Sequence, residues 1–148
     1  MPSASYLLDT NVLVYATLAA DPRHARAKAL LLGAGATPRP SVFVSAQNLA
    51  EMWPTLTGPR TDPPDAPGIA AAKIESVASL PHVTVLSVDR DTVRIALRLA
   101  AGRAVTRQRY FDVQVAAVML QNGVRRLYTE NLADFRDIDG IEAVNPFV

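Results

Sequence analysis

The chain has 148 residues, a formal net charge of +1, 49% apolar residues and no cysteine. This length predicts a single domain over residues 1–148 with a sizeable core, and the near-neutral charge provides no strong overall attraction to nucleic acid. The lack of cysteine excludes disulfides and thiolate metal sites, and because we find no signal peptide or long apolar run, we expect a cytoplasmic protein without a membrane span.

Short apolar runs alternate with helical patterns along the chain. In chain order, we expect a strand at 5–8, a helix at 21–33, a strand at 41–46, helices at 45–58 and 69–80, a strand at 82–88, helices at 90–103 and 112–123, and strands at 125–129 and 141–144. Residues 11–19 fit either an extension of the first strand or a helix that opens at Thr10 and Asn11. Prolines and glycines predict a loop at 58–68, and 131–135 fits a turn of helix or a loop.

Several helices carry terminal signals. Asp21 and Pro22 predict the cap and first turn of one helix, and Gly33 predicts its end. Ser45 is the predicted cap of the next helix. Pro54 should bend or end that helix, because proline lacks an amide donor and clashes with the carbonyl one turn back.

Strands that alternate with helices indicate an α/β domain with a parallel sheet, in which ligands bind at the carboxyl ends of the strands. Asp9 follows the first strand, Glu51 lies in the helix after the second, and Asp112 begins the helix that precedes the fourth. The segment after the fourth strand carries further polar groups, namely Glu130, Asn131 and Asp134. If the first and fourth strands are neighbours, these groups converge on one edge of the sheet.

Carboxylates that share one cleft need cations, because like charges repel and burial costs solvation. Oxygen ligands favour Mg²⁺ or Mn²⁺, and with only His24 and His82 in the chain we do not expect a zinc site. Such a cluster suits phosphodiester hydrolysis by metal-activated water. Each acid also has a structural explanation: Asp9 and Asp112 could cap helices, and Glu51 could belong to a solvated helix face.

Four segments carry these acids in order: "LLDTNVLVYA", "VSAQNLAEMW", "RYFDVQVAAVMLQNG" and "LYTENLADF", with "AVNPF" near the end. They resemble the four motifs and the usual ending of PIN domains, in particular the VapC-type toxins of bacterial toxin–antitoxin pairs. The resemblance covers essentially the whole chain. It implies a three-layer α/β/α domain with a central parallel sheet of about five strands.

The resemblance also implies cleavage of RNA, such as a tRNA or ribosomal RNA loop, that depends on Mg²⁺ or Mn²⁺. By position, Asp9, Glu51 and Asp112 match the acidic triad. Asp9 and Asp112 would then be direct metal ligands. Glu51 would bind the metal directly or through water, or orient the attacking water.

The remaining motif positions are less uniform. Thr10 and Asn11 match the polar residues that brace the first aspartate. Asn131 stands where many relatives have an aspartate, so it would be a neutral ligand or a hydrogen-bond donor to a ligand. Asp134 would then complete the cluster, and whether one or two metals bind is left open.

The resemblance implies partners as well: a homodimer, an RNA substrate and a VapB-type antitoxin whose tail lies along the active-site groove. Arg107 and Arg109 directly precede Asp112 and could contact RNA phosphates at the rim of the site. The alternative is that these arginines belong to a solvated loop.

Other α/β classes that place acids at strand ends fit less well. A haloacid-dehalogenase-like phosphatase needs a second acid where Asn11 stands, and a response-regulator receiver needs a late lysine, whereas none follows Lys73. A catalytically silent PIN-like module that only binds RNA or protein should lack one or more triad acids, and all three are present. A free-standing RNA-processing PIN nuclease is the alternative among enzymes.

Overall fold

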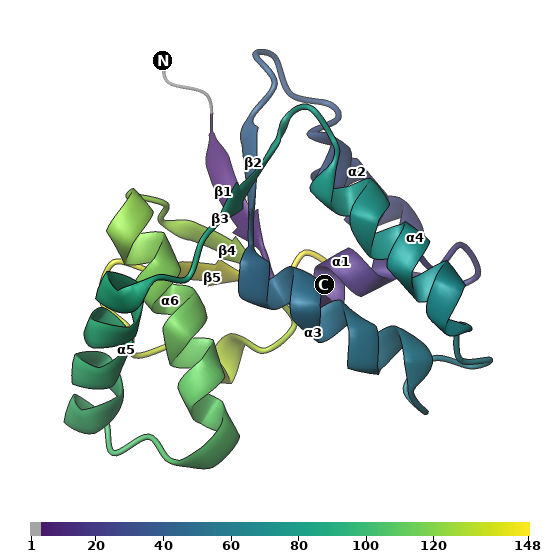
Figure 1. The fold of residues 1–148 in the computed structure, drawn as a ribbon. Coiled ribbons are helices and arrows are strands. Elements are labelled where there is room, and N and C mark those ends of the chain that lie inside the picture. Colours follow the sequence, from purple (N-terminus) through teal and green to yellow (C-terminus); the bar gives the residue numbers. More distant parts are fainter. Residues whose placement is uncertain (1–3) are drawn as a thin grey trace.

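The computed structural model describes residues 4–148, and their five strands form one sheet with helices on both faces (Figure 1). The strands are β1 (Ser5–Leu8), β2 (Ser41–Ser45), β3 (Val83–Leu86), β4 (Arg126–Tyr128) and β5 (Glu142–Val144). Their order is β3-β2-β1-β4-β5, and every neighbouring pair is parallel. The predicted α/β fold with a five-stranded parallel sheet is therefore confirmed.

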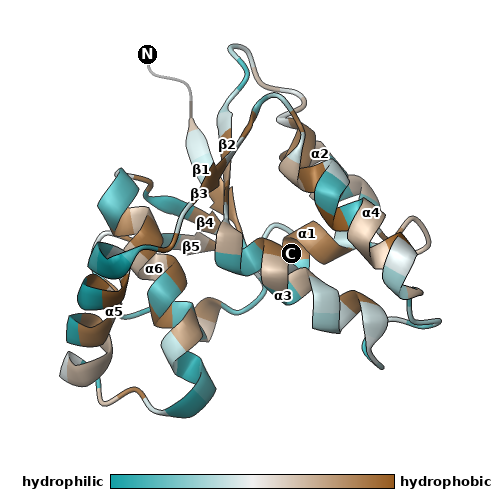
Figure 2. Ribbon diagram, in the orientation of Figure 1, coloured by the Kyte–Doolittle hydropathy of each residue, from teal (hydrophilic) through white to brown (hydrophobic). Residues whose placement is uncertain are grey.

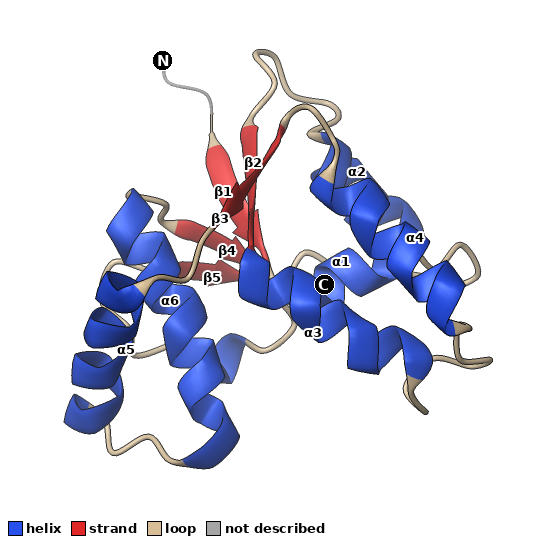
Figure 3. Cartoon of the chain, viewed as in Figure 1, coloured by secondary structure: helices blue, strands red, loops and turns tan. Residues whose placement is uncertain are grey.

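Helices cover the sheet in two layers (Figure 3). The layers contain α1 (Thr10–Tyr15), α2 (His24–Leu32), α3 (Ala46–Thr57) and α4 (Pro67–Ala78) on one face, and α5 (Arg90–Gly102) and α6 (Tyr110–Asn122) on the other. Two 3₁₀ turns, η1 (Arg107–Arg109) and η2 (Leu132–Asp134), flank α6 and β4. No helix among residues 4–148 is long and apolar enough to cross a membrane.

Alternation along β1 explains why both faces of the sheet are covered. Tyr6 and Leu8 pack into the core beneath α1 to α4, whereas Leu7 packs into the opposite core beneath α6. Successive side chains of a strand point to opposite faces, so an entirely apolar strand needs a helical layer on each side. Figure 2 shows hydrophobic residues in the central strands, with helices of mixed hydropathy on both sides of the sheet.

Local signals predicted some helix ends correctly. Ser45 caps α3, because its side chain accepts a hydrogen bond from the Asn48 amide. Gly33 ends α2 with a φ of +62°, a left-handed conformation that glycine adopts without strain. The prediction of a helix after Asp9 is also confirmed, and Asp9 itself is the N-cap of α1.

Other boundaries differ from the prediction. The N-cap of α2 is Arg23, not Asp21, because the Asp21 carboxylate accepts from both the amide and the guanidinium of Arg23. Helix α3 continues to Thr57, so Pro54 does not end it; Pro54 lies on the exposed side, where water can reach the carbonyl that loses its donor. Helix α6 starts before Asp112, with Arg109 as its N-cap, so Asp112 is not the predicted cap.

The order of the strands places a topological switch point between β1 and β4. The two strands pair directly, with Leu8 opposite Tyr128, and the Asp9 amide continues the ladder by donating to the Tyr128 carbonyl over 3.1 Å. After β1 the chain forms β2 and β3 on one side of that strand, and it later forms β4 and β5 on the other side. Open parallel sheets bind ligands in the crevice that this divergence creates.

Candidate functional site

A pocket of about 280 Å³ lies at the carboxyl ends of β1 and β4. It brings together the three predicted acids, since Asp9, Glu51 and Asp112 all line it. Its other charged lining residues are Asp21, Arg23, Arg60 and Glu130. The predicted convergence of acids from distant segments is therefore present in the fold.

Asp9 is 6% exposed and is held by donors on both carboxylate oxygens. Its Oδ1 accepts from the Thr10 amide at 2.8 Å and from Asn48 Nδ2 at 3.1 Å. Its Oδ2 accepts from the Thr129 hydroxyl at 2.8 Å and from Asn11 Nδ2 at 3.5 Å. Burial raises the pKa of Asp9, and the hydrogen bonds from Thr129, Thr10 and Asn48 oppose that rise by stabilising the charged form.

The hydrogen bonds around the Thr129 hydroxyl determine the group to which it donates its proton. Its oxygen accepts hydrogen bonds from the Asn131 amide at 3.0 Å and from Asn11 Nδ2 at 3.3 Å. Because both of these groups can only donate, the single hydroxyl proton of Thr129 is directed to Asp9. The long contact from Asn11 to Asp9 is the weakest of the four, which leaves Oδ2 the most open position for another partner.

Glu51 is positioned by a chain of amides that joins α3 to α6. The Tyr110 hydroxyl donates to Gln114 Oε1, and Gln114 Nε2 donates to Gln47 Oε1. Gln47 Nε2 then donates to Glu51 Oε1 at 2.5 Å and to the Phe111 carbonyl at 2.9 Å. Partial burial, together with the charge of Asp9, raises the pKa of Glu51 although the carboxylate end reaches solvent.

Asp112 lies in the first turn of α6 and faces the other acids. Burial raises its pKa to about 7, with further increases from the negative charges of Asp134, Asp9 and Glu51. Arg109 acts in the opposite direction but does not cancel these effects. Burial and the three neighbouring acids therefore disfavour the charged form of Asp112.

The two residues that were expected to complete the acidic cluster, Asn131 and Asp134, line different cavities. Asn131 lines the pocket, and its amide holds Thr129. Asp134 lines a neighbouring cavity instead, where its carboxylate lies 3.6 Å from Arg109. Arg109 lines that same neighbouring cavity, and the acid pocket is lined by neither Arg109 nor Arg107 among the residues described.

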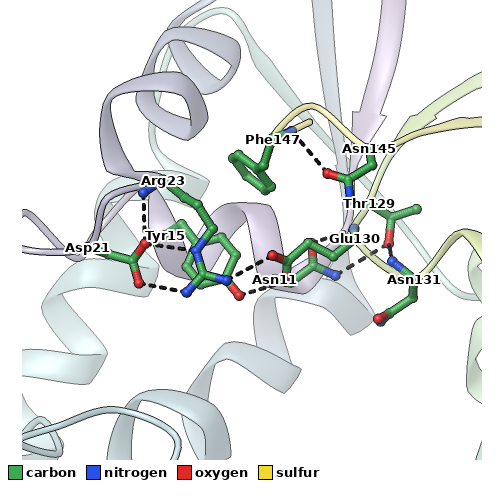
Figure 4. Close-up of polar contacts among 9 residues, drawn as sticks. All are labelled: Asn11, Tyr15, Asp21, Arg23, Thr129, Glu130, Asn131, Asn145 and Phe147. Carbon is green, nitrogen blue, oxygen red and sulfur yellow. Dashed lines mark hydrogen bonds and ion pairs between the residues drawn. The ribbon is translucent and has the colours of Figure 1, made fainter.

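A second network of side chains lines the same pocket and is shown in Figure 4. Arg23 bonds Asp21 through Nε and Nη2, each at 2.9 Å, and bonds Glu130 through Nη1 at 2.9 Å. The Tyr15 hydroxyl donates to the other oxygen of Glu130 at 2.6 Å. Sequence patterns did not indicate this network, because they had assigned Asp21 to a helix cap and had treated Glu130 as one of several acids after β4.

A family model for the PIN domain matches residues 6–141 of the chain. The chain belongs to the PIN-domain family. Among curated relatives of this PIN domain, Ribonuclease VapC48 of Mycobacterium tuberculosis is 29% identical over 97% of the chain and 98% of its own length. Ribonuclease VapC24 of the same species is 28% identical over 88% of both chains.

Solved structures show the same fold. The VapC20 toxin of M. tuberculosis, which cleaves the sarcin–ricin loop, superposes with a TM-score of 0.68 at 23% identity, over 88% of this PIN domain and 93% of that chain. VapBC2 of Rickettsia felis, solved with a DNA fragment from its promoter, gives a TM-score of 0.66 at 17% identity over 95% and 98%. At these identities the likeness establishes the fold of the PIN domain.

The donor set of the pocket fits a hard divalent cation. Asp9, Glu51, Asp112 and Asn131 supply oxygen atoms, and the raised pKa of Asp112 reports negative charge that a cation would balance. As placed, no three acidic or histidine side chains among residues 4–148 are arranged to hold one ion together.

Proposed function

We propose that this PIN domain is an endoribonuclease that depends on Mg²⁺ or Mn²⁺ and acts as the toxin of a VapBC-type pair. The observation that carries the proposal is the buried Asp9, which shares one pocket with Glu51 and Asp112 at the switch point of the sheet. The two curated relatives are ribonucleases, which supports the same activity.

In this proposal, Asp9 and Asp112 hold the ion, with Asp134 as a further acid at longer range through its charge on Asp112. A bound divalent cation lowers the pKa of a water and stabilises the leaving oxygen of a phosphodiester. Thr10 and Asn11 brace Asp9 through the contacts described above. Asn131 contributes by orienting Thr129.

Glu51 has the role of orienting the attacking water. Gln47 bonds its Oε1, and no hydrogen bond engages the second oxygen among the described residues, so that oxygen is available to accept a proton from water. The raised pKa of Glu51 makes it a better proton acceptor than an ordinary surface glutamate. In this proposal, Glu51 of α3 accepts the proton of the water, whereas Asp9 at the end of β1 and Asp112 of α6 hold the ion.

The proposal includes partners. Several solved structures with the same fold are toxin–antitoxin complexes, such as one from Klebsiella pneumoniae that superposes with a TM-score of 0.63. We propose that an antitoxin of the VapB type restrains this protein, that the toxin is a homodimer, and that the substrate is a loop of tRNA or ribosomal RNA. If the toxin assignment fails, the alternatives are a free-standing RNA-processing PIN nuclease and a catalytically silent PIN-like module that binds RNA or protein.

The test is cleavage of total RNA by purified protein in Mg²⁺ or Mn²⁺, with and without a chelator. We expect the chelator and Asp9→Asn to abolish cleavage, whereas Asp139→Asn, a matched change in an exposed turn, should leave it intact. Expression of the native chain should arrest growth, and expression of Asp112→Asn should not. Cleavage that survives chelation, or equal growth of both strains, would refute the toxin ribonuclease.

A further inference from the structure

The wall of the pocket formed by Asp21, Arg23, Tyr15 and Glu130 has a chemistry that the proposed metal site does not use. The guanidinium of Arg23 donates from Nε, Nη1 and Nη2 to the carboxylates of Asp21 and Glu130. These contacts lie along the edges of the guanidinium plane. They hold the plane in one orientation, as Figure 4 shows.

Charge argues against a phosphate at this wall. One guanidinium is paired with two carboxylates, so the cluster has a formal charge of −1. Arg23 already donates from all three of its nitrogen atoms, and an incoming phosphate would meet the negative charge of two carboxylates. A phosphate site needs the opposite balance of charge.

The faces of the guanidinium are what this wall offers instead. The central carbon of Arg23 lies 3.7 Å from the centre of the Tyr15 ring, which covers one face. The edge of Phe147 packs against the same ring at 5.4 Å and 80°, so the ring is supported in turn. The side chain of Arg23 is 37% exposed and lines the pocket, and Tyr15 is the only ring that covers its guanidinium among the described residues.

Glu130 holds the two planes together. One of its oxygens accepts from Arg23 and the other from the Tyr15 hydroxyl, so the guanidinium and the ring cannot slide past each other. Burial and the bond to Glu130 raise the pKa of Tyr15 to about 12, which keeps that hydroxyl protonated as a donor. The result is a rigid, planar surface with one open face.

From this geometry we propose that Arg23, stacked on Tyr15, is a platform for an unpaired nucleobase of the RNA substrate. Unpaired bases stack on guanidinium planes and aromatic rings, and this contact needs no donor from the edge of the guanidinium. The proposal rests on the ribonuclease assignment and extends it, because it places one base beside the acids and so orients the phosphodiester next to them.

The test uses Asp112→Asn protein, which should bind RNA without cutting it, and short single-stranded RNAs that carry 2-aminopurine at one position at a time. We expect fluorescence to fall on binding at one position, because stacking quenches this base. An abasic nucleotide at that position should weaken binding about tenfold. In an added Arg23→Lys background, which keeps the charge but lacks the plane, the abasic penalty should be less than about twofold.

Arg98→Lys, a matched change at an exposed position on α5, should retain the full abasic penalty. An abasic penalty that is equal with and without the Arg23→Lys change would overturn the platform, and so would binding without a quenched position. Failure of Asp112→Asn protein to bind any RNA would instead refute the ribonuclease assignment itself.

A second measurement does not depend on the folding of an Arg23 variant. RNA with a photoreactive base at the quenched position should form an adduct with the peptide that contains Tyr15 or Arg23, identified by mass spectrometry. An adduct confined to the peptides of η1 and α6 would place the base on the other side of the pocket and overturn the platform.

Discussion

The side-chain amide of Asn48 donates to Asp9 over 3.1 Å and thereby joins α3 to the end of β1. Asn48 is fully buried, and its side-chain oxygen Oδ1 accepts a hydrogen bond from the Ser45 hydroxyl. Its Nδ2 also donates to the Thr10 hydroxyl at 3.0 Å. One amide therefore connects the helix cap, the helix start and the first acid.

The first prediction concerns this amide. Asn48→Ala should lower Mn²⁺ affinity by about 10–100-fold, because groups that orient metal ligands have effects of that size. It should also reduce the free energy of unfolding by about 1–3 kcal/mol, since Ser45 and Asp9 lose a buried partner. Calorimetric titration and urea unfolding measure the two effects, with Asn122→Ala, whose amide contacts only the Val118 carbonyl among the described residues, as the control. Unchanged Mn²⁺ affinity in a folded variant would count against the role of Asn48.

The second prediction concerns the pH dependence of stability without metal. The pKa of Asp112 in the folded protein is about 7, above its ordinary value of 3.8. The folded state therefore binds more protons than the unfolded state between these values, and the contribution of Asp112 is lost as pH rises through about 7. Asp112→Asn should be more stable than the native chain at about pH 8.5, by on the order of 1–3 kcal/mol because the carboxyl is only partly buried.

Near pH 4 the two proteins should differ little, because Asp112 is then protonated in the folded state. Urea unfolding at both pH values, with a chelator present, measures this difference. Added Mg²⁺ should stabilise the native chain more than Asp112→Asn at the higher pH. A native chain that is the more stable protein at about pH 8.5 without metal would contradict the crowded carboxylates described here.

The third prediction separates the arginines. Arg60 lines the pocket and makes no hydrogen bond or ion pair among the described residues, whereas Arg109 is paired with Asp134 and lies outside the pocket. Arg60→Ala should therefore weaken RNA binding and reduce the dependence of log K on log salt by about 0.7, the loss of one phosphate contact. Arg107→Ala, measured by the same fluorescence titration, should change the slope less. A larger effect of Arg107→Ala than of Arg60→Ala would instead support the contacts with RNA phosphates that the sequence suggested for Arg107 and Arg109.

The fourth prediction concerns the strand that carries Asp9. Leu7 is fully buried, and β1 pairs with both β2 and β4 at this residue. Leu7→Ala should reduce the free energy of unfolding by about 2–5 kcal/mol, because a cavity would remain at the centre of the sheet. Leu97→Ala is the matched control, since Leu97 is 55% exposed, and its effect should stay within about 0.5 kcal/mol. Equal effects of the two changes on the urea midpoint would show that the sheet relaxes around the cavity.

Periodicity and turn residues were sufficient for the strands and their alternation with helices, because these depend on local pattern, whereas the three layers and the acidic triad were expected from the resemblance to PIN domains. These local patterns failed where a side chain bonds a partner that spacing does not indicate, or where a helix begins without a capping side chain. Asp21 looked like a cap but bonds Arg23, and α6 begins at a residue with no capping side chain.

Thr10 and Asn11 were expected beside Asp9, but its contacts with Asn48 and Thr129 could not be found from spacing. Asn48 lies 39 residues away in the chain and Thr129 lies 120 away. Only the pairing of β1 with its neighbours determines which polar groups meet.

The ladder that continues past Leu8 into Asp9 has a consequence for tolerance of insertions. The Asp9 amide is tied to Tyr128, so one added residue within β1 would turn the carboxylate away from Thr129 and Asn48. An added residue in the turn at 34–38, before β2, would leave that pairing untouched. The placement of Asp9 thus depends on the register between β1 and β4 and not on the length of the turn before β2.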